Sequence, residues 1–323
     1  MSEYRALAPA KVNLGLFLGP TRALDGRHEL VTVMQSISLA DELTLAPAPP
    51  GAIDDEVICP GVLRPSGENL AAAALRSFRA STAWEAPPLR LSILKRIPVA
   101  AGMAGGSADA AATLRLASRA SGLGDERLLL ELAAGLGADV PAQVSPGRWL
   151  ASGAGECLQG LPDPGASLGL LVLPLAAELS TAAVFAEADR LGLSRALAEL
   201  ERRSGELHAE LERGAPLPAE RGLLHNDLQR AAISLCPQIV DALEQARGAG
   251  GEPALLSGSG PTVVGLFAGE RGDPGGGLRR AERAAAQLRA RAPAPFAAMA
   301  VDAAFARPLS VTERSAEGGD APR

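Results

Sequence analysis

The feature that most constrains this chain is a glycine-rich segment, residues 98–109, that joins a strand-like run to a run of small residues. Residues 89–97 alternate apolar and polar side chains and predict a strand. Residues 108–120 are rich in alanine and predict a helix. Backbone N–H groups at the start of a helix lack intrahelical partners and lie at the positive end of the helix dipole. A segment in this position is therefore suited to binding an anion.

The glycine spacing leaves the kind of loop open. Gly102, Gly105 and Gly106 have no Cβ, so the backbone can turn sharply and come close to a phosphate. No lysine follows them as the Walker signature requires, and their spacing does not fit the dinucleotide-binding fingerprint. By itself the cluster fits a plain turn as well as a phosphate-binding loop. Ser107 can cap the following helix, or turn its hydroxyl toward a phosphate or a metal ion.

Composition narrows the class of protein. A chain of 323 residues is long enough for two domains, each with its own core. Hydrophobic residues make up 47% and charged residues 21%, which is typical of a soluble globular protein. The net charge of -6 argues against a nucleic-acid-binding surface, although it leaves room for a local basic pocket that takes a phosphorylated ligand.

The cysteines and the apolar runs predict where the protein resides. Cys59, Cys157 and Cys236 are odd in number and widely spaced, so neither a disulfide framework nor a metal site is indicated. We therefore expect a reducing, cytoplasmic compartment. The first residues lack the apolar core of a signal peptide, and we find no run of the ~20 apolar residues needed to span a membrane.

Strand-like and helix-like segments alternate in both halves, which predicts an α+β chain of two domains. We place the first domain at residues 1–160 and the second at 161–307, and expect the polar tail, 308–323, to be disordered. Strands are expected at 5–18, with a break at Pro9 and Lys11, in two segments within 29–45, within 147–173 and at 297–305. Helices are expected at 69–79, 126–136, 195–213, 226–247 with an interruption at Pro237, and 278–291. A second glycine loop lies within 255–267 and leads into a strand.

Two charged residues stand in apolar surroundings. Lys11 lies inside a strand-like run, where an ammonium is costly unless it meets an anion. It fits a ligand-binding lysine, and also a lysine that extends to solvent at a strand end. Asp139 follows the end of a predicted helix and is flanked by apolar residues. It fits a catalytic carboxylate, and also an aspartate that merely forms a turn.

Taken together, these segments resemble the GHMP small-molecule kinases. The first motif of that family resembles residues 9–14, the second resembles 98–109 and the third resembles 256–261. The similarity extends from about residue 5 to 306 and includes Asp25 to Leu30, Leu39 to Asp41 and Asn226 to Leu228. The resemblance implies an N-terminal domain like the second domain of ribosomal protein S5 and a C-terminal ferredoxin-like domain, with the substrates in the cleft between them.

The resemblance also implies an ATP-dependent kinase and assigns roles to residues. Asp139 matches the family's catalytic aspartate, which accepts the proton of the substrate hydroxyl, and Lys11 matches its partner lysine. A neighbouring cation keeps such a carboxylate ionised. The ATP phosphates, bridged by Mg²⁺, are expected on a loop that comprises Pro98, Val99, Ala100, Ala101, Gly102, Met103, Ala104, Gly105, Gly106, Ser107 and Ala108. The metal ligands are not evident, although Ser107 is one candidate.

Within the family, the chain resembles the branch that phosphorylates a cytidine-diphosphate-linked polyol on the non-mevalonate route to isoprenoid precursors. That resemblance implies that His28 hydrogen-bonds the cytosine and that Phe185 packs on its face, with Asn13 and Thr181 close by. We expect small-molecule partners and a monomer or weak homodimer. The alternatives are a GHMP kinase that acts on mevalonate or homoserine, or a catalytically silent member that binds a ligand.

The chain departs from the family pattern at four positions. Arg27 stands where a tyrosine is common, and a guanidinium can also stack on a base. Met103 and Ala104 replace the usual leucine and glycine, and Ala108 replaces a serine. These changes are expected to weaken ATP binding but remove no catalytic group.

Overall fold

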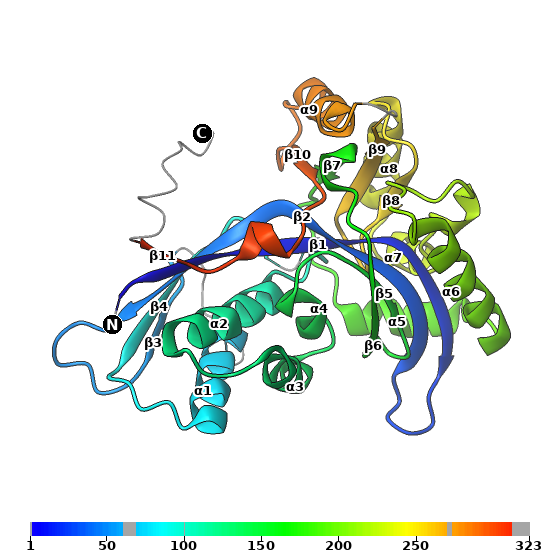
Figure 1. Cartoon of the computed structure of the whole chain (residues 1–323). Coiled ribbons are helices and arrows are strands. Elements are labelled where there is room, and N and C mark those ends of the chain that lie inside the picture. Colours follow the sequence, from blue (N-terminus) through cyan, green and yellow to red (C-terminus); the bar gives the residue numbers. More distant parts are fainter. Residues whose placement is uncertain (1, 61–68, 100, 270–272, 312–323) are drawn as a thin grey trace.

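The computed structural model describes residues 2–60, 69–99, 101–269 and 273–311 and has two β-sheets, each with its own helices (Figure 1). The first sheet, with seven strands among these residues, is built on the antiparallel pair β1 (Tyr4–Thr21) and β2 (His28–Pro47). β4 (Leu89–Leu94) pairs with β2, and β3 (Glu56–Ile58) pairs with β4. β5 (Arg148–Ser152) pairs with the beginning of β2, and β6 (Cys157–Leu161) pairs with β5.

Four helices cover one face of this sheet (Figure 1). They are α1 (Leu70–Thr82), α2 (Gly105–Ser121), α3 (Glu126–Leu136) and α4 (Val140–Val144). α2 packs on β1 and β2, and the other three helices pack around it. The alanines of α2 are buried because small side chains let the helix lie close to both the sheet and its neighbours. This packing fixes the start of α2 beside β1.

The second sheet has four strands among the described residues, in the order β10 (Phe296–Met299), β7 (Leu168–Leu173), β9 (Val263–Ala268) and β8 (Ala254–Leu256). α8 (Gln238–Gly248) and α9 (Gly276–Gln287) pack on it. α5 (Thr181–Arg190) packs against α7 (Gln229–Leu235), whereas α6 (Leu197–Leu211) packs on β1 and β2 of the first sheet. Short 3₁₀ turns occur at Gly165–Ser167, Arg221–Leu223 and Ala303–Ala306.

The predicted α+β class is confirmed, and several element boundaries agree. Asp125 caps α3 by accepting from Leu128 N, and the helix ends at Gly137, as the residue types indicate. The predicted interruption at Pro237 separates α7 from α8. α2 begins at Gly105, three residues before the predicted start. The predicted division near residue 160 stays a prediction.

Other expectations are corrected. The predicted break in the first strand is wrong: β1 runs on through Pro9 and Lys11, and its pairing with β2 only shifts register there. The two segments expected within 29–45 form one strand, β2. The last predicted strand is shorter, because β10 stops at Met299 and the Asp302 side chain caps a 3₁₀ turn by accepting from two backbone amides.

The expected disordered tail is also wrong at its start. Leu309–Ser310 forms β11, which pairs with the beginning of β1 at the outer edge of the first sheet. An exposed strand edge offers unpaired backbone groups, and this short stretch satisfies some of them. The rest of the predicted tail, 312–323, lies outside the described residues.

Candidate active site

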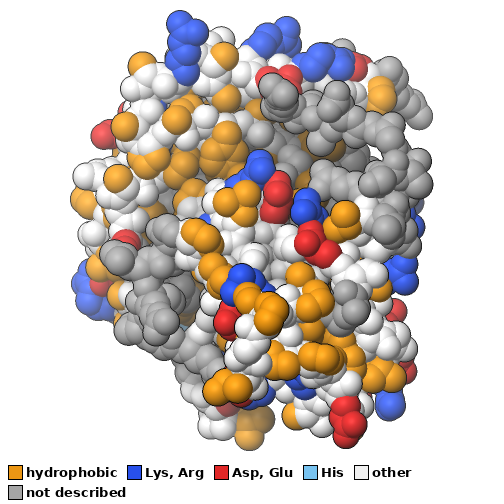
Figure 2. All heavy atoms as spheres, turned by 90° about the vertical axis from the view of Figure 1, so that its left-hand side faces the viewer, with side chains coloured by type: hydrophobic (Ala, Val, Ile, Leu, Met, Phe, Trp, Pro, Cys, Tyr) orange, Lys and Arg blue, Asp and Glu red, His pale blue; other side chains and the backbone are white. Residues whose placement is uncertain are grey.

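A cleft of about 1490 Å³ opens where the first sheet meets the glycine-rich segment and the second glycine loop. Its walls are supplied by β1 and β2, by the start of α2, by the start of α5 and by the turn that follows β8. The segments that form it are therefore far apart in the sequence. On the face of the molecule in Figure 2, acidic and basic side chains are interspersed with hydrophobic ones among the coloured residues.

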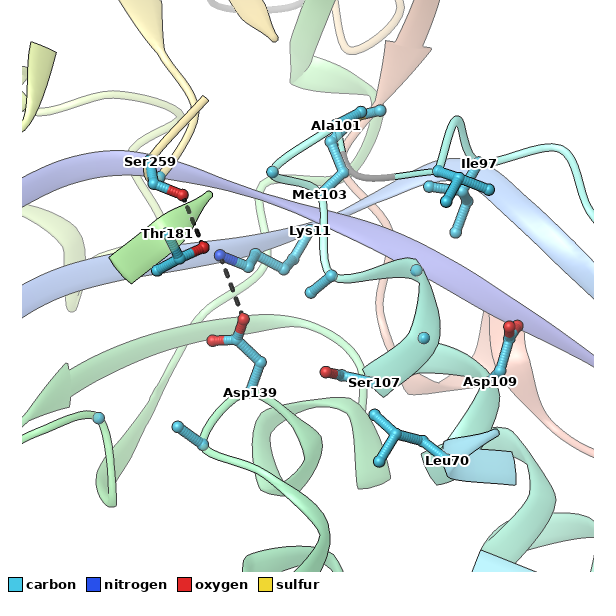
Figure 3. A pocket seen from close by; sticks show the side chains of 18 of the residues that line it. Lys11, Leu70, Ile97, Ala101, Met103, Ser107, Asp109, Asp139, Thr181 and Ser259 are labelled. Atoms are coloured by element: carbon cyan, nitrogen blue, oxygen red, sulfur yellow. Dashed lines mark hydrogen bonds and ion pairs between the residues drawn. The ribbon is translucent and has the colours of Figure 1, made fainter. Parts of the chain in front are cut away.

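The backbone of the glycine-rich segment is fixed at the start of α2. Its backbone is tied to β1 because Lys11 N donates to Met103 O at 3.1 Å. Ala104 is the N-cap of α2 and adopts the left-handed conformation with φ 55° and without a side-chain cap bond. That conformation costs an alanine about 1–2 kcal/mol, whereas a glycine adopts it freely. Ser107 is therefore not the helix cap; it lies in the first turn with its hydroxyl toward the cleft (Figure 3).

Lys11 and Asp139 meet in the centre of the cleft (Figure 3). The Lys11 Nζ lies 3.6 Å from Asp139 Oδ2 and donates to Asn13 Oδ1 at 2.8 Å. Lys11 is 8% exposed, so its ammonium is largely removed from water, whereas the Asp139 side chain is 40% exposed and remains open to a ligand. Asp139 is carried into the cleft by the turn between α3 and α4. Asn13 is itself fixed, because its amide donates to Thr32 Oγ1 at 2.8 Å.

A ring pair forms one end of the cleft. The rings of His28 and Phe185 lie 5.2 Å apart between centroids and are tilted by 41°. His28 is buried, with Nδ1 3.1 Å from Gly19 O and Nε2 3.3 Å from Asp189 Oδ2. Asp189 follows Phe185 by one helical turn on α5, so both side chains lie on the same face. Both ring nitrogens of His28 are therefore engaged.

A buried ion cluster supports the other end of the cleft. Lys95 Nζ pairs with Asp41 and, at 2.8 Å, with Asp109. Asp41 also accepts from two backbone amides just before the glycine-rich segment. Burial raises the pKa of Asp109 to about 7, an effect that the ion pair with Lys95 opposes. Burial alone would lower the pKa of Lys95, but Asp109 and Asp41 raise it, so the ammonium stays charged.

Most of the predicted site residues line this cleft. They are Lys11, Asn13, His28, Pro98, Val99, Ala101, Gly102, Met103, Ala104, Gly105, Gly106, Ser107, Asp139, Thr181 and Phe185, together with Arg27. Ala108 does not: its side chain is buried in the core, and its N–H donates to Ala104 O at 2.9 Å, because it already lies inside the hydrogen-bonded helix. Ala100 lies outside the described residues.

Several lining residues were missed by the sequence analysis. Ser259 Oγ lies 3.0 Å from Thr181 Oγ1. Gly258, the preceding residue, also lines the cleft. Their glycine loop was recognised, which is a usable signal, but its place in the cleft was not. Lys95, which lines the cleft, and Asp189, which contacts His28, gave no signal of their own, because a lysine after a strand and an acidic residue on a helix are usually solvated.

Oxygen donors suited to a cation line the cleft. Within the described ranges, no group of three or more His, Cys, Asp and Glu side chains is arranged to hold a metal ion. Mg²⁺ in kinase sites is usually held by one or two carboxylates together with substrate phosphates. The Asp139 carboxylate and the Ser107 hydroxyl both line the cleft. The residues present therefore fit a Mg²⁺ ion that a bound nucleotide shares.

Comparison with known families gives a match in each half of the chain. Residues 69–147 match the GHMP kinases N terminal domain, and residues 193–294 match the GHMP kinases C terminal domain. No helix in the described part of the chain has both the length and the apolar character needed to cross a membrane.

Individual proteins give a finer comparison. The chain is 42% identical to a 4-diphosphocytidyl-2-C-methyl-D-erythritol kinase from Streptomyces coelicolor, over 79% of this chain and 85% of that protein. A crystal structure of 4-(cytidine 5'-diphospho)-2C-methyl-D-erythritol kinase superposes with a TM-score of 0.70 at 31% identity, covering 92% of this chain and 99% of the other. Homoserine kinase from Cytophaga hutchinsonii superposes with a TM-score of 0.68 at 16% identity, covering 96% and 98%, which shows a shared fold alone.

Proposed function

Because the chain belongs to the GHMP kinase family, we propose that it transfers the γ-phosphoryl group of ATP to the 2-hydroxyl of 4-(cytidine 5'-diphospho)-2-C-methyl-D-erythritol. It is an ATP-dependent small-molecule kinase of isoprenoid precursor synthesis. The observation that carries the proposal is the approach of Lys11 to Asp139, 3.6 Å apart in a cleft that also receives the start of α2. The relatives with the same activity in their names support this substrate over mevalonate or homoserine.

Asp139 acts as the general base. Its partly exposed carboxylate is open to the substrate hydroxyl, and the Lys11 ammonium lies 3.6 Å from its Oδ2. As the hydroxyl oxygen attacks the γ-phosphorus, its proton passes to Asp139 and the bond from the phosphorus to the ADP oxygen breaks. Lys11 faces the charge that spreads over the moving phosphoryl group and holds the hydroxyl in line.

The start of α2 holds the phosphates of ATP. Gly105 and Gly106 bring unpaired N–H groups to the cleft without a side chain in the way. The Ser107 hydroxyl would help to hold a Mg²⁺ ion that accompanies the nucleotide, and the ion would supply positive charge that offsets the charge on the phosphates. Ala108 has no part in this contact, because its N–H is already bonded within the helix.

The cytidine moiety lies against the ring pair of His28 and Phe185. The cytosine packs on the Phe185 face, and His28, whose ring lies 5.2 Å from the Phe185 ring between centroids, hydrogen-bonds the polar edge of the base. The Arg27 guanidinium, which donates to Ala154 O at 2.6 Å, provides the second stacking surface. Asn13 and Thr181 contact the polar groups between the base and the reacting hydroxyl.

The organisation around this site follows from the two sheets. Residues 1–160 form the ATP-binding domain, and residues 161–307 form the domain that completes the substrate site. The protein works on small molecules, in the cytoplasm, as a monomer or weak homodimer.

A direct assay tests the proposal. The purified protein is incubated with ATP and Mg²⁺, and ADP release is followed with each of three acceptors in turn: the cytidine-linked methylerythritol, mevalonate and homoserine. We expect turnover with the first and background rates with the other two. Turnover with mevalonate or homoserine in its place contradicts the proposed substrate, and ATP binding without turnover of any acceptor indicates a silent member.

A further inference from the structure

Asn226 is a buried amide that the proposed chemistry does not use. It is 4% exposed and stands in the segment between α6 and α7. Its Nδ2 donates to Leu256 O and to Gly258 O, each at 2.8 Å, and its Oδ1 accepts from Leu228 N at 2.9 Å. The side chain thus satisfies three backbone groups at once: one on α7's leading turn, one at the end of β8 and one, Gly258 O, in the second glycine loop.

The second glycine loop lies directly behind the Lys11 ammonium. A Cβ placed on Gly258 would be 3.2 Å from Asn13 Oδ1 and 3.7 Å from Lys11 Nζ. Gly258 has φ +55°, a conformation in which a glycine peptide turns at little cost. The next residue, Ser259, reaches to Thr181 beside the Lys11 ammonium (Figure 3). The orientation of the Gly258 peptide therefore bears on what Lys11 contacts.

The same segment is joined to the strand that carries Lys11. Leu16 N donates to His225 O at 2.7 Å, and Asp227 N donates to Leu16 O at 3.0 Å. Asn226 thus stands between two fixed points: β1 on one side and the turn 257–260 on the other.

We propose that Asn226 is a positioning residue, which keeps the Gly258 carbonyl turned away from Lys11 so that the ammonium stays free for Asp139 and the transferred phosphoryl group. Lys11 has three protons, and Asn13 Oδ1 takes one of them. A Gly258 carbonyl released from Asn226 competes for the others and draws the ammonium away from Asp139. The catalytic consequence rests on the proposed function, whereas the effect on Lys11 does not.

The test exploits the two lysines of this chain, Lys11 and Lys95. With lysine labelled by ¹³C at Cε, an NMR spectrum shows one signal for each, and Lys11→Arg assigns them. Asn226→Asp keeps the shape of the side chain but replaces the donor with a carboxylate facing two carbonyl oxygens. Asn226→Ala removes the donor without placing a negative charge against the two carbonyl oxygens. It replaces Asn226→Asp in the test if that variant does not fold.

The matched control is Gln229→Ala. Gln229 Oε1 accepts from Leu256 N at 3.1 Å, so the control removes a hydrogen bond to the same strand and leaves Gly258 untouched. Melting temperatures, measured on all variants, show that each is folded at the assay temperature.

In both Asn226 variants we expect the Lys11 signal to shift and the Lys95 signal to stay. We expect kcat to fall about ten-fold or more, with the KM of the cytidine-linked substrate within about two-fold, because a misdirected ammonium weakens stabilisation of the transferred phosphoryl group and leaves the cytidine contacts in place. The control should match wild type in both measurements.

An unmoved Lys11 signal, an unchanged kcat or an equal effect in Gln229→Ala overturns the positioning role. Inactivity of the wild-type protein on this substrate overturns the proposed function instead, and the Lys11 signal still decides the role of Asn226.

Discussion

At the scale of single residues, the side chain proposed to accept the proton and the side chain proposed to bind the cytosine lie in different parts of the cleft. Asp139 is 40% exposed and next to an ammonium, which suits a carboxylate that must meet a substrate hydroxyl. Phe185 lies on α5 and packs against His28 at one end of the cleft. Changes at these two positions should therefore separate chemistry from binding.

Asp139→Asn should abolish most turnover and leave ATP binding nearly intact. The amide keeps the shape of the side chain but cannot accept the proton, and general-base catalysis typically contributes about 10²–10⁴ in rate. Steady-state kinetics give the loss of kcat, and calorimetric titration with an ATP analogue gives the affinity. A variant that keeps most of its activity would rule out Asp139 as the base.

Phe185→Ala should raise the KM of the cytidine-linked substrate more than it lowers kcat. Stacking of a base on an aromatic ring is worth about 1–3 kcal/mol and acts alike in the ground state and the transition state. We expect KM to rise about ten-fold or more in initial-rate measurements, with the KM of ATP as the internal control. An unchanged KM would remove Phe185 from the binding site.

At the scale of elements, the two glycine loops pack backbone against backbone. A Cβ on Gly102 would lie 2.6 Å from Gly260 O and 2.9 Å from Ser257 O, and the Ser257 hydroxyl donates to Gly102 O at 3.4 Å. Backbone atoms cannot move aside as flexible side chains do. The loop that precedes α2 and the loop that follows β8 therefore depend on each other for their shape.

Gly102→Ala should raise the KM of ATP about ten-fold or more and lower the melting temperature, because the new methyl group forces the two loops apart. Gly122→Ala is the matched control, since Gly122 has nearly the same φ, +70° against +72°, with nothing within 4 Å of the added Cβ. The control should show only the backbone cost of about 1–2 kcal/mol in unfolding experiments, with an unchanged KM. Equal effects on KM in both variants would show that the contact between the loops is unimportant.

At the scale of the whole molecule, one buried carboxylate joins the second half of the chain to β1. Asp227 accepts from Leu18 N at 2.9 Å and from two nitrogens of Arg195, at 2.6 and 2.7 Å. The Arg195 guanidinium also lies over the Phe17 ring, 5.3 Å from its centroid. Burial alone would raise the pKa of Asp227, but the hydrogen bonds with Arg195, His225 and the Leu18 amide lower it to about 2.

This pKa predicts how stability depends on pH. A folded-state pKa below the unfolded value of 3.8 means that the unfolded chain binds the proton more readily. The stabilisation is complete above the unfolded pKa and is lost as the pH falls through about 2. Asp227→Asn should therefore lower the free energy of unfolding at pH 7 and flatten its decline between pH 4 and pH 2.

Urea denaturation at several pH values measures both effects. Glu201→Gln, which removes an exposed carboxylate from α6, should keep the wild-type pH dependence. If Asp227→Asn also declines as steeply as wild type, Asp227 does not govern acid unfolding.

Local residue patterns predicted those features that depend only on residues close in sequence, namely helix boundaries and the glycine-rich segment. Asp125, Gly137 and Pro237 marked helix boundaries because caps and helix breakers act within a turn of their own position. The glycine-rich segment was recognised because a strand, a tight turn and a helix start follow one another in sequence. The extent of β1 could not be predicted, because the long partner strand β2 holds Pro9 and Lys11 in the sheet against their local preference.

The tertiary structure decided which of these pieces face one another. The distance of 3.6 Å between Lys11 and Asp139 depends on α2 packing on β1 and α3 packing on α2, and no local pattern encodes that packing. The paired carboxylates on Lys95 and the amide of Asn226 likewise acquire their partners only after distant segments meet. The sequence by itself determined the segments and the chemical groups that they carry. Their convergence was decided by the folded chain, because burial and hydrogen bonding between remote residues are properties of the packed molecule.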